Sequence, residues 1–352
     1  MKTKFFLSVF SISLLISCSK PQPVNLEEMS AGILNDVSQN VVEYSFRDLR
    51  DHSVSYQNSV AALLANSNTA NLEDARTKWR ELRAVWEQCE GFLWGPVSTG
   101  GYDPHTDTWP VNWVDMNALM ASNVTFNDSL IDNLDDALKG YHPMEYMLWG
   151  KNGNKTAADL TSREKEYLQA LSQNTARTIA ALYAQYDLSQ STSYLHHIIH
   201  AGNQTSWYAS KRAAFEELVN GMSGICEEVA GGKIEEPFSL QDPSKEESPF
   251  SKNSLTDFAN NIRSVQNLYN GKYRDREGKG IADFVKETNA SLNNKIQSQL
   301  NTAIASLEVI PVPFGEAILT HQSQLLQAQK AINDLHETLE DELLPLVQQK
   351  VK

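Results

Sequence analysis

Residues 140–150 bring a histidine and a carboxylate together in an apolar, aromatic stretch, Gly-Tyr-His-Pro-Met-Glu-Tyr-Met-Leu-Trp-Gly. Pro143 suits the first turn of a helix because it has no N–H and a preset φ, so we expect His142 at the N-cap and Glu145 at the third helical position. Side chains three residues apart share a helix face, where an imidazole and a carboxylate can bind one cation. The spacing equally fits a site without metal, in which Glu145 reaches back to the helix start as in a capping box.

Two ligands do not make a metal site, so further carboxylates must come from other elements. A helix predicted over residues 71–94 carries Arg83, Glu87 and Glu90 at spacings of three and four, which places them on one face. Asp115 follows Asn112 by three residues at a predicted helix start, where a plain capping role is the alternative. The predicted ligands are His142, Glu145, Glu90 and Asp115. The residues predicted to orient these ligands without binding the metal themselves are Arg83, Glu87 and Asp257. Carboxylates and one imidazole projecting into a helical bundle suit iron or a similar divalent cation, with zinc as the other candidate.

Other histidine-containing patterns are interpreted as surface features. They are the group His196, His197 and His200, the group His336, Glu337 and Glu340, and the group His105, Asp103 and Asp107. The first has no adjacent carboxylate, the second lacks the second histidine of a zinc-protease helix, and the third lies in a turn-rich polar loop.

The first 17 residues read as a bacterial lipoprotein signal. Two lysines precede a short apolar run that is too short to span a membrane, and the run ends in Leu-Ile-Ser-Cys. Cys18 is therefore the predicted lipidated first residue of the mature protein. We expect a protein anchored to the outer membrane and facing the periplasm.

The elements that must position the site are predicted to be helices almost throughout, because apolar residues recur every three or four positions. The fold class expected is all-α, with two helical bundles related by a possible duplication. Residues 18–160 are assigned to the first bundle, which contains the His-Glu motif, and residues 161–352 to the second. The formal net charge of −14 argues against nucleic acid or an anionic membrane surface as a partner and favours cations.

The chain resembles the imelysin family over nearly all of its mature length. The residues that carry the resemblance are Gly140, His142 and Glu145 with Leu148-Trp149-Gly150, the upstream set Trp79, Arg83, Trp86, Glu90, Phe92, Gly95-Pro96 and Trp109-Pro110, and the downstream segments 231–234, 247–251 and 253–258. The resemblance implies two helical bundles with the motif near their interface, and an association with bacterial iron acquisition.

Three classes of function remain open at this point. The first is a lipoprotein that binds a metal, or an iron-containing ligand such as haem, and hands it on or senses it. The second is a metallopeptidase, the activity for which the family was first named. The third is a helical scaffold in which His142 and Glu145 only bond each other. A single histidine beside carboxylates favours cation binding over a zinc hydrolase.

Overall fold

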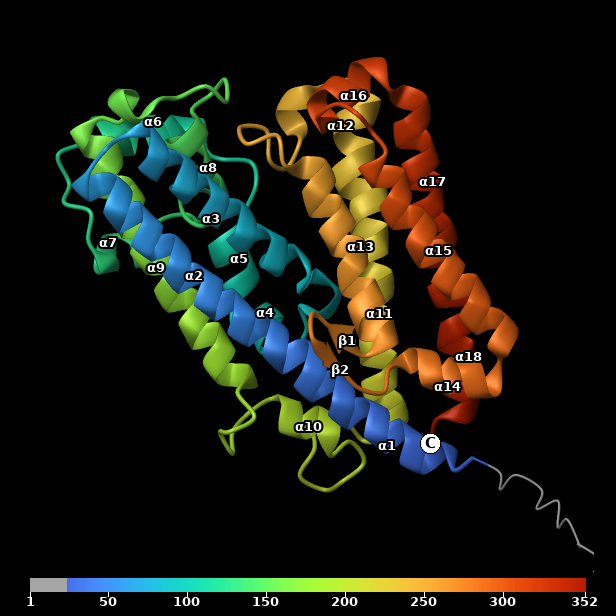
Figure 1. Cartoon of the computed structure of the whole chain (residues 1–352). Coiled ribbons are helices and arrows are strands. Elements are labelled where there is room, and N and C mark those ends of the chain that lie inside the picture. Colours follow the sequence, from blue (N-terminus) through green and yellow to red (C-terminus); the bar gives the residue numbers. More distant parts are fainter. Residues whose placement is uncertain (1–23) are drawn as a thin grey trace, which may run out of the picture.

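The structure, a computed structural model, describes residues 24–352 as two helical bundles lying side by side (Figure 1). Apart from two short antiparallel strands, every regular element in this range is helical, which confirms the all-α prediction. The predicted signal segment and Cys18 lie outside the described residues. No helix within residues 24–352 is both long and apolar enough to cross a membrane.

The first half of the chain is built around three long helices. Its elements are α1 (Leu26–Val37), α2 (Tyr44–Ala65), α3 (Thr69–Glu87), α4 (Pro96–Thr99), α5 (Tyr102–Asp107), α6 (Trp113–Ala121), α7 (Asp128–Asp132), α8 (Tyr141–Trp149), α9 (Ser162–Tyr186) and α10 (Leu195–Ile199). Helix α2 packs between α3 and α9, and α8 packs on α3. The predicted domain boundary falls just before α9, a helix that packs on α2.

The second half forms a bundle of α11, α13, α15 and α17. Its elements are α11 (Lys211–Glu227), α12 (Glu235–Leu240), α13 (Ser254–Asn270), β1 (Lys272–Tyr273), β2 (Arg276–Glu277), α14 (Ile281–Thr288), α15 (Ala290–Glu308), α16 (Phe314–Thr320), α17 (Gln322–Thr338) and α18 (Leu344–Lys350). Wider π-helical turns connect α1 to α2, α11 to α12 and α17 to α18, at Ser38–Glu43, Glu228–Ile234 and Leu339–Leu343. The proposed duplication stays a prediction.

Local sequence signals explain where the long helices begin and end. The Asn25 side chain caps α1, and the chain stays helical through the π turn until Asn66. Thr161 and Glu164 form a capping box at the start of α9. Gly271 in the left-handed conformation ends α13. These signals are short-range, so they fix the helices without fixing how the bundles meet.

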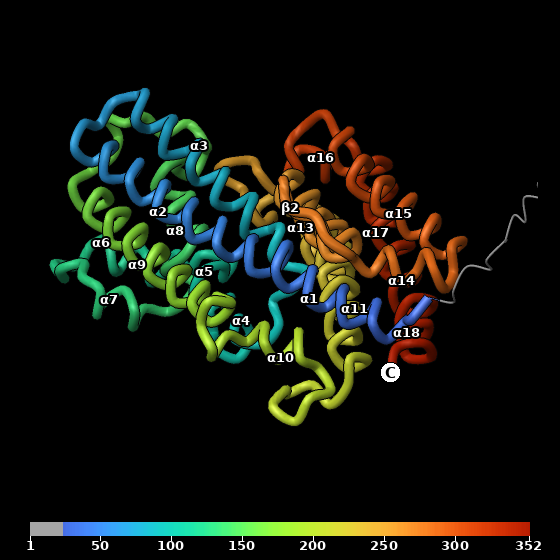
Figure 2. Tube along the Cα trace, turned by 60° about the horizontal axis from the view of Figure 1, so that its bottom comes forward, coloured from blue at the N-terminus to red at the C-terminus, as the bar shows by residue number. Residues whose placement is uncertain are grey.

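The bundles meet along α3 and the 3-10 turn that follows it, Glu90–Phe92, which pack against α11 and α13. The N-terminal helix α1 also contacts α10, α11 and α14, so it crosses from one bundle to the other (Figure 2). Cys89 follows α3 and Cys226 lies in α11, and both are free, buried thiols. The junction between the bundles is where charged residues are buried, as described next.

Candidate metal centre

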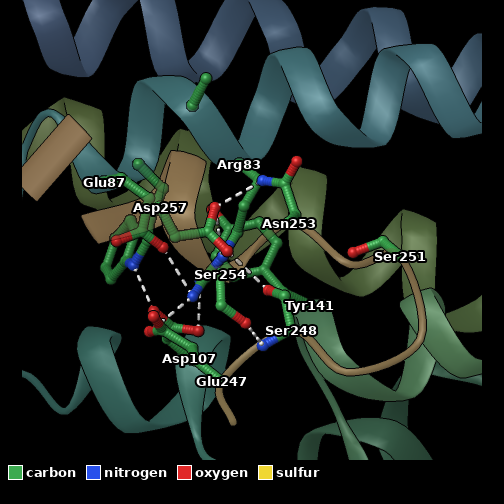
Figure 3. A network of polar contacts seen from close by, with 12 residues as sticks. Arg83, Glu87, Asp107, Tyr141, Glu247, Ser248, Ser251, Asn253, Ser254 and Asp257 are labelled. Carbon is green, nitrogen blue, oxygen red and sulfur yellow. Dashed lines mark hydrogen bonds and ion pairs between the residues drawn. The ribbon is translucent and has the colours of Figure 1, made fainter. Parts of the chain in front are cut away.

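A network of charged side chains is buried where the two bundles meet (Figure 3). The first bundle contributes Arg83 and Glu87 from α3, Glu90 from the following turn, Asp107 from the end of α5, and His142 and Glu145 from α8. The second bundle contributes Lys233 from its π turn, Glu247 from the loop before α13, and Asp257 from α13. The network therefore requires both bundles to be docked.

Arg83 lies at the centre of this network and is completely buried. Its guanidinium lies 2.6 Å from Glu87 and 2.9 Å from Glu247, and it also donates to Asp107. Burial alone would lower the pKa of Arg83, but the neighbouring carboxylates, Asp107 first, raise it well above its usual value. The permanent positive charge of Arg83 thus holds carboxylates from both bundles.

Lys233 supplies the second positive charge. Its ammonium lies 2.8 Å from Glu90 and 3.0 Å from Glu247, and its side chain is only 12% exposed. The amide of Asn261 donates to Glu87 Oε2 at 2.5 Å and to Glu90 Oε2 at 2.9 Å. Lys233 and Asn261 therefore hold these carboxylates together from the side of the second bundle.

Four carboxylates form what we call the carboxylate cluster: Glu87, Glu90, Asp107 and Glu247. Each offers one oxygen, and these four oxygens lie within 4.8 Å of one another. If all four are ionised, Arg83 and Lys233 leave the cluster two positive charges short. Burial raises the pKa of Glu87 and that of Glu90 well above the usual value, so protons partly fill this deficit.

His142 lies beside the cluster and is 1% exposed. Its Nε2 is 3.1 Å from Asp107 Oδ1 and its Nδ1 is 3.5 Å from Glu145 Oε2. Both contacts are ion pairs when the ring is protonated, and neither nitrogen has a further hydrogen-bond partner among the described residues. Burial would lower the pKa of His142, but Asp107, followed by Glu145, raises it above its usual value, so a cation bound here would replace a proton of the ring.

Asp107 links His142 to the carboxylate cluster. Its Oδ2 accepts a hydrogen bond of 2.6 Å from the Trp86 indole, while Oδ1 faces Arg83 and His142. Burial would raise the pKa of Asp107, but Arg83, followed by His142, lowers it well below its usual value. Asp107 is therefore an ionised carboxylate shared by the two parts of the site.

Glu145 does not form the capping box that was one alternative for the motif. Its Oε1 accepts hydrogen bonds from Phe250 N at 3.1 Å, Ser251 N at 2.7 Å and Ser251 Oγ at 2.6 Å. The other oxygen, Oε2, faces His142 and has no hydrogen-bond partner within the described chain. Glu145 thus fixes the loop of the second bundle with one oxygen and leaves the other available.

The glycine of the motif has a steric role. Helix α8 begins at Tyr141 with Gly140 as its N-cap, two residues earlier than predicted, so His142 lies inside the first turn. Gly140 has a φ of +80°, and a Cβ at this position would lie 2.1 Å from the Thr106 carbonyl oxygen. Only glycine lets α8 approach the end of α5 this closely, and that approach places His142 against Asp107.

The structure brings six of the seven predicted side chains into this region and leaves one outside. Asp115 is exposed at the start of α6, where Asn112 donates to it at 2.7 Å, so it serves its own helix end. Within residues 24–352 no hydrogen bond or ion pair joins Asp115 to the network, which differs from the predicted ligand set. Its position is set by a local cap, and the spacing alone could not distinguish this role from a ligand.

Asp257 lies behind Arg83 at 3.9 Å and accepts from Ser248 at 2.7 Å and Asn253 at 2.6 Å. Burial raises the pKa of Asp257 to about 7. Asp257 thus contacts Arg83 without belonging to the carboxylate cluster, and its supporting role stays a prediction.

Sequence reasoning missed Asp107, Glu247, Lys233 and Asn261. Asp107 was noticed only as a neighbour of His105, in a pattern interpreted as a polar loop. Glu247 and Lys233 lie in the segments 247–251 and 231–234, which carried the family resemblance but were given no role. The resemblance was thus the available signal for these two residues.

The remaining histidine patterns lie outside the network. His105 pairs with Asp136 at 2.7 Å and is 46% exposed, and the rings of His196 and His200 stack on each other. His336, predicted to face solvent, is only 17% exposed because its ring contacts Ser223 in α11.

A cavity of about 320 Å³ opens beside the carboxylate cluster. Its acidic lining residues are Glu90, Asp103, Asp107, Glu228, Glu236 and Glu247, with Lys233, Lys245 and Trp109 completing much of the wall. Burial, followed by the charge of Asp107, raises the pKa of Asp103 to about 6. The cavity gives a small cation a route to the cluster through a negatively charged opening.

Comparison with known proteins gives a consistent picture. The family model described as Imelysin (Peptidase_M75) matches residues 43–341. The chain is 28% identical over 340 residues to iron-regulated protein A of Synechococcus elongatus, covering 96% of this chain and 91% of that protein.

Two crystal structures share the fold. A putative iron-regulated protein A precursor from Parabacteroides distasonis gives a TM-score of 0.81 at 24% identity, covering 96% of this chain and 97% of that one. An imelysin-like protein from Psychrobacter arcticum gives a TM-score of 0.74 at 12% identity, covering 92% of this chain and 96% of that one.

Proposed function

The chain belongs to the imelysin family, and from this premise we propose that it binds a metal cation at the carboxylate cluster between its two bundles. Iron is the first metal to test, because two of the similar proteins carry the name iron-regulated protein A. In this proposal the protein holds the cation at the cell envelope for transfer or sensing, without cleaving a substrate.

The observation that carries the proposal is a set of four carboxylates, each with an oxygen within 4.8 Å of the others, beside the buried imidazole of His142. When all four are ionised, Arg83 and Lys233 balance two of their charges, and a divalent cation would balance the other two in place of the protons that Glu87 and Glu90 otherwise hold. Carboxylate oxygens and one imidazole nitrogen are the ligands that iron and manganese accept in helical bundles. The carboxylates of Glu87, Glu90, Asp107 and Glu247 would hold the cation. The Nε2 atom of His142, which faces Asp107, would be a further ligand.

The surroundings favour a small cation over the alternatives. Haem would need an extensive apolar pocket, whereas six carboxylates line the adjoining cavity of about 320 Å³. A zinc hydrolase generally uses more than one imidazole and an open cleft for peptide, whereas a single histidine stands beside these carboxylates. A scaffold in which His142 and Glu145 bond only each other is disfavoured because His142 also lies 3.1 Å from Asp107 of the carboxylate cluster.

Calorimetric titration of the metal-free protein with Fe²⁺ under anaerobic conditions, and with Mn²⁺ as a redox-stable counterpart, tests the proposal. We expect one saturable site that is weakened at least about tenfold by Glu87→Gln and by His142→Ala. Glu87→Gln keeps the size and one oxygen of the side chain, so the amide of Asn261 still has an acceptor.

Asp115→Asn is the matched control, because this carboxylate is exposed and lies apart from the network. It should bind like the wild type. Unchanged binding in both site variants would refute the proposal, and a loss in Asp115→Asn and His142→Ala but not in Glu87→Gln would favour the ligand set predicted from the sequence.

We also propose that Cys18 carries a lipid that anchors the protein at the outer membrane, facing the periplasm. The support is the Leu-Ile-Ser-Cys ending of the signal segment. Metabolic labelling with a fatty acid should mark the wild type and not Cys18→Ala, and a labelled variant would refute the anchor.

A further inference from the structure

A second cavity, of about 510 Å³, lies next to the candidate metal centre and has a different chemistry. Its aromatic walls are Trp109, Trp113, Tyr146 and Phe250, and we call it the aromatic cleft. Trp109 lines both cavities, so one indole separates the acidic cavity from the aromatic cleft. The volume is within the range of sites for small organic ligands.

The aromatic walls are pre-arranged by their own contacts. Trp113 meets Tyr146 at 4.8 Å and Phe250 at 5.8 Å, and Tyr146 meets Phe250 at 5.2 Å, with each pair close to edge-to-face. Trp113 is nevertheless 37% exposed, so this cluster leaves aromatic surface open to the cleft. A planar ring of a ligand can add to such a cluster by the same edge-to-face or offset contacts.

The charge of the cleft is opposite to that of the protein. Its charged lining residues are Lys151 and Lys252, and no aspartate or glutamate is among the residues that line it. Lys252 lies 3.6 Å from Glu246, whereas Lys151 forms no ion pair within residues 24–352. In a chain with a formal net charge of −14, a cleft whose charged lining residues are both lysines favours an anion over a cation.

We infer that the aromatic cleft binds a small planar aromatic anion, such as an aromatic carboxylate. The rings supply contact area for the aromatic part, and Lys151 and Lys252 supply charge for the carboxylate. A cation of similar shape would be repelled by both ammonium groups, and an aliphatic anion would lose the ring contacts. This inference goes beyond the proposed metal function and does not require it.

The test uses the full-length protein, stripped of metal with a chelating resin, and salicylate as the probe. Binding is measured by calorimetry and by saturation-transfer NMR, with benzyl alcohol as a neutral aromatic comparison and cyclohexanecarboxylate as a non-aromatic anion. We expect saturable binding of salicylate that is at least about tenfold tighter than that of either comparison compound.

Two variants test whether salicylate binds in the aromatic cleft. Trp113→Ala and Lys151→Gln should each weaken salicylate binding at least about fivefold, and both sites are exposed enough for the fold to tolerate the change. The matched control is Trp207→Ala, which removes a 72% exposed tryptophan from a different cavity and should leave binding unchanged.

The inference is overturned if salicylate does not saturate, if either comparison compound binds as tightly, or if Trp207→Ala weakens binding as much as Trp113→Ala. Because metal is absent throughout, failure here says nothing against the metal site. Failure of the metal titration would likewise leave this result standing.

Discussion

Replacing Lys233 by methionine should tighten cation binding and at the same time destabilise the metal-free protein. The Lys233 ammonium lies 2.8 Å from Glu90 and 3.0 Å from Glu247, so it occupies space beside the oxygens that a cation would use. At a separation of about 5 Å and an effective dielectric constant of about 20, two unit charges interact by about 3 kcal/mol. A divalent cation feels up to about twice this repulsion.

The wild type can relieve part of this repulsion, because the Lys233 side chain is 12% exposed and can move outward when a cation enters. We therefore expect the Lys233→Met variant to bind Mn²⁺ at least about tenfold more tightly, which corresponds to about 1.4 kcal/mol. Without metal, the buried carboxylates lose a partner, and the free energy of unfolding should fall by roughly 3 kcal/mol.

Calorimetry with Mn²⁺ and urea unfolding with and without metal measure both effects. The matched control is Lys245→Met, because Lys245 lines the same cavity but is 43% exposed and pairs with Glu236 at 3.4 Å. The control should change affinity by less than about threefold. If the folded Lys233→Met variant binds Mn²⁺ no better than the wild type, the cation does not enter the carboxylate cluster and the reasoning fails.

Two further predictions concern stability. Gly140→Ala should lower the free energy of unfolding in urea by at least about 2 kcal/mol, because alanine is strained at a φ of +80° and its Cβ would overlap the Thr106 carbonyl. Gly224→Ala, at a helical glycine with open space around it, should not destabilise the protein, and equal effects would contradict this explanation. A hydrogen bond with Asp48 raises the pKa of His52, so this pair stabilises the fold below the unfolded pKa of about 6.5 and the contribution is lost as pH rises through the folded pKa. Between about pH 6 and pH 9 the unfolding free energy of the wild type should fall by more than that of His52→Gln, whereas parallel pH profiles would exclude the effect.

The helices could be predicted from the sequence because their signals are local. Asn25, Thr161 and Gly271 mark helix ends through their own side chains or backbone conformation, and the structure places caps at all three. Asn289 ends α14 and caps α15, so it divides residues 281–308 into two helices. This division is local as well, since asparagine is a common capping residue.

The site could be predicted only in part. Arg83 and Glu87 share one face of α3, and His142 and Glu145 lie together in α8, as their spacing predicted. Glu90 lies in the 3-10 turn after α3, because that helix ends at Glu87 and does not continue to residue 94 as predicted. Which carboxylate would meet His142 depends on how a loop folds over the junction. Asp107 and Asp115 are both acidic residues near helix ends in the same region, and only the packing of α5 against α8 selects Asp107.

The Arg83 guanidinium, whose acidic partners come from both bundles, has a consequence for how the chain can be divided. A fragment ending after α9 would keep the guanidinium but lose Glu247, and a fragment starting at α11 would keep Lys233 and Glu247 without the arginine. Each fragment would carry unmatched charge on its newly bared surface. Only the native arrangement of the two halves pairs these charges, whereas other ways of packing their apolar surfaces leave them unpaired. Complementary fragments mixed in solution should therefore reassemble in the native arrangement.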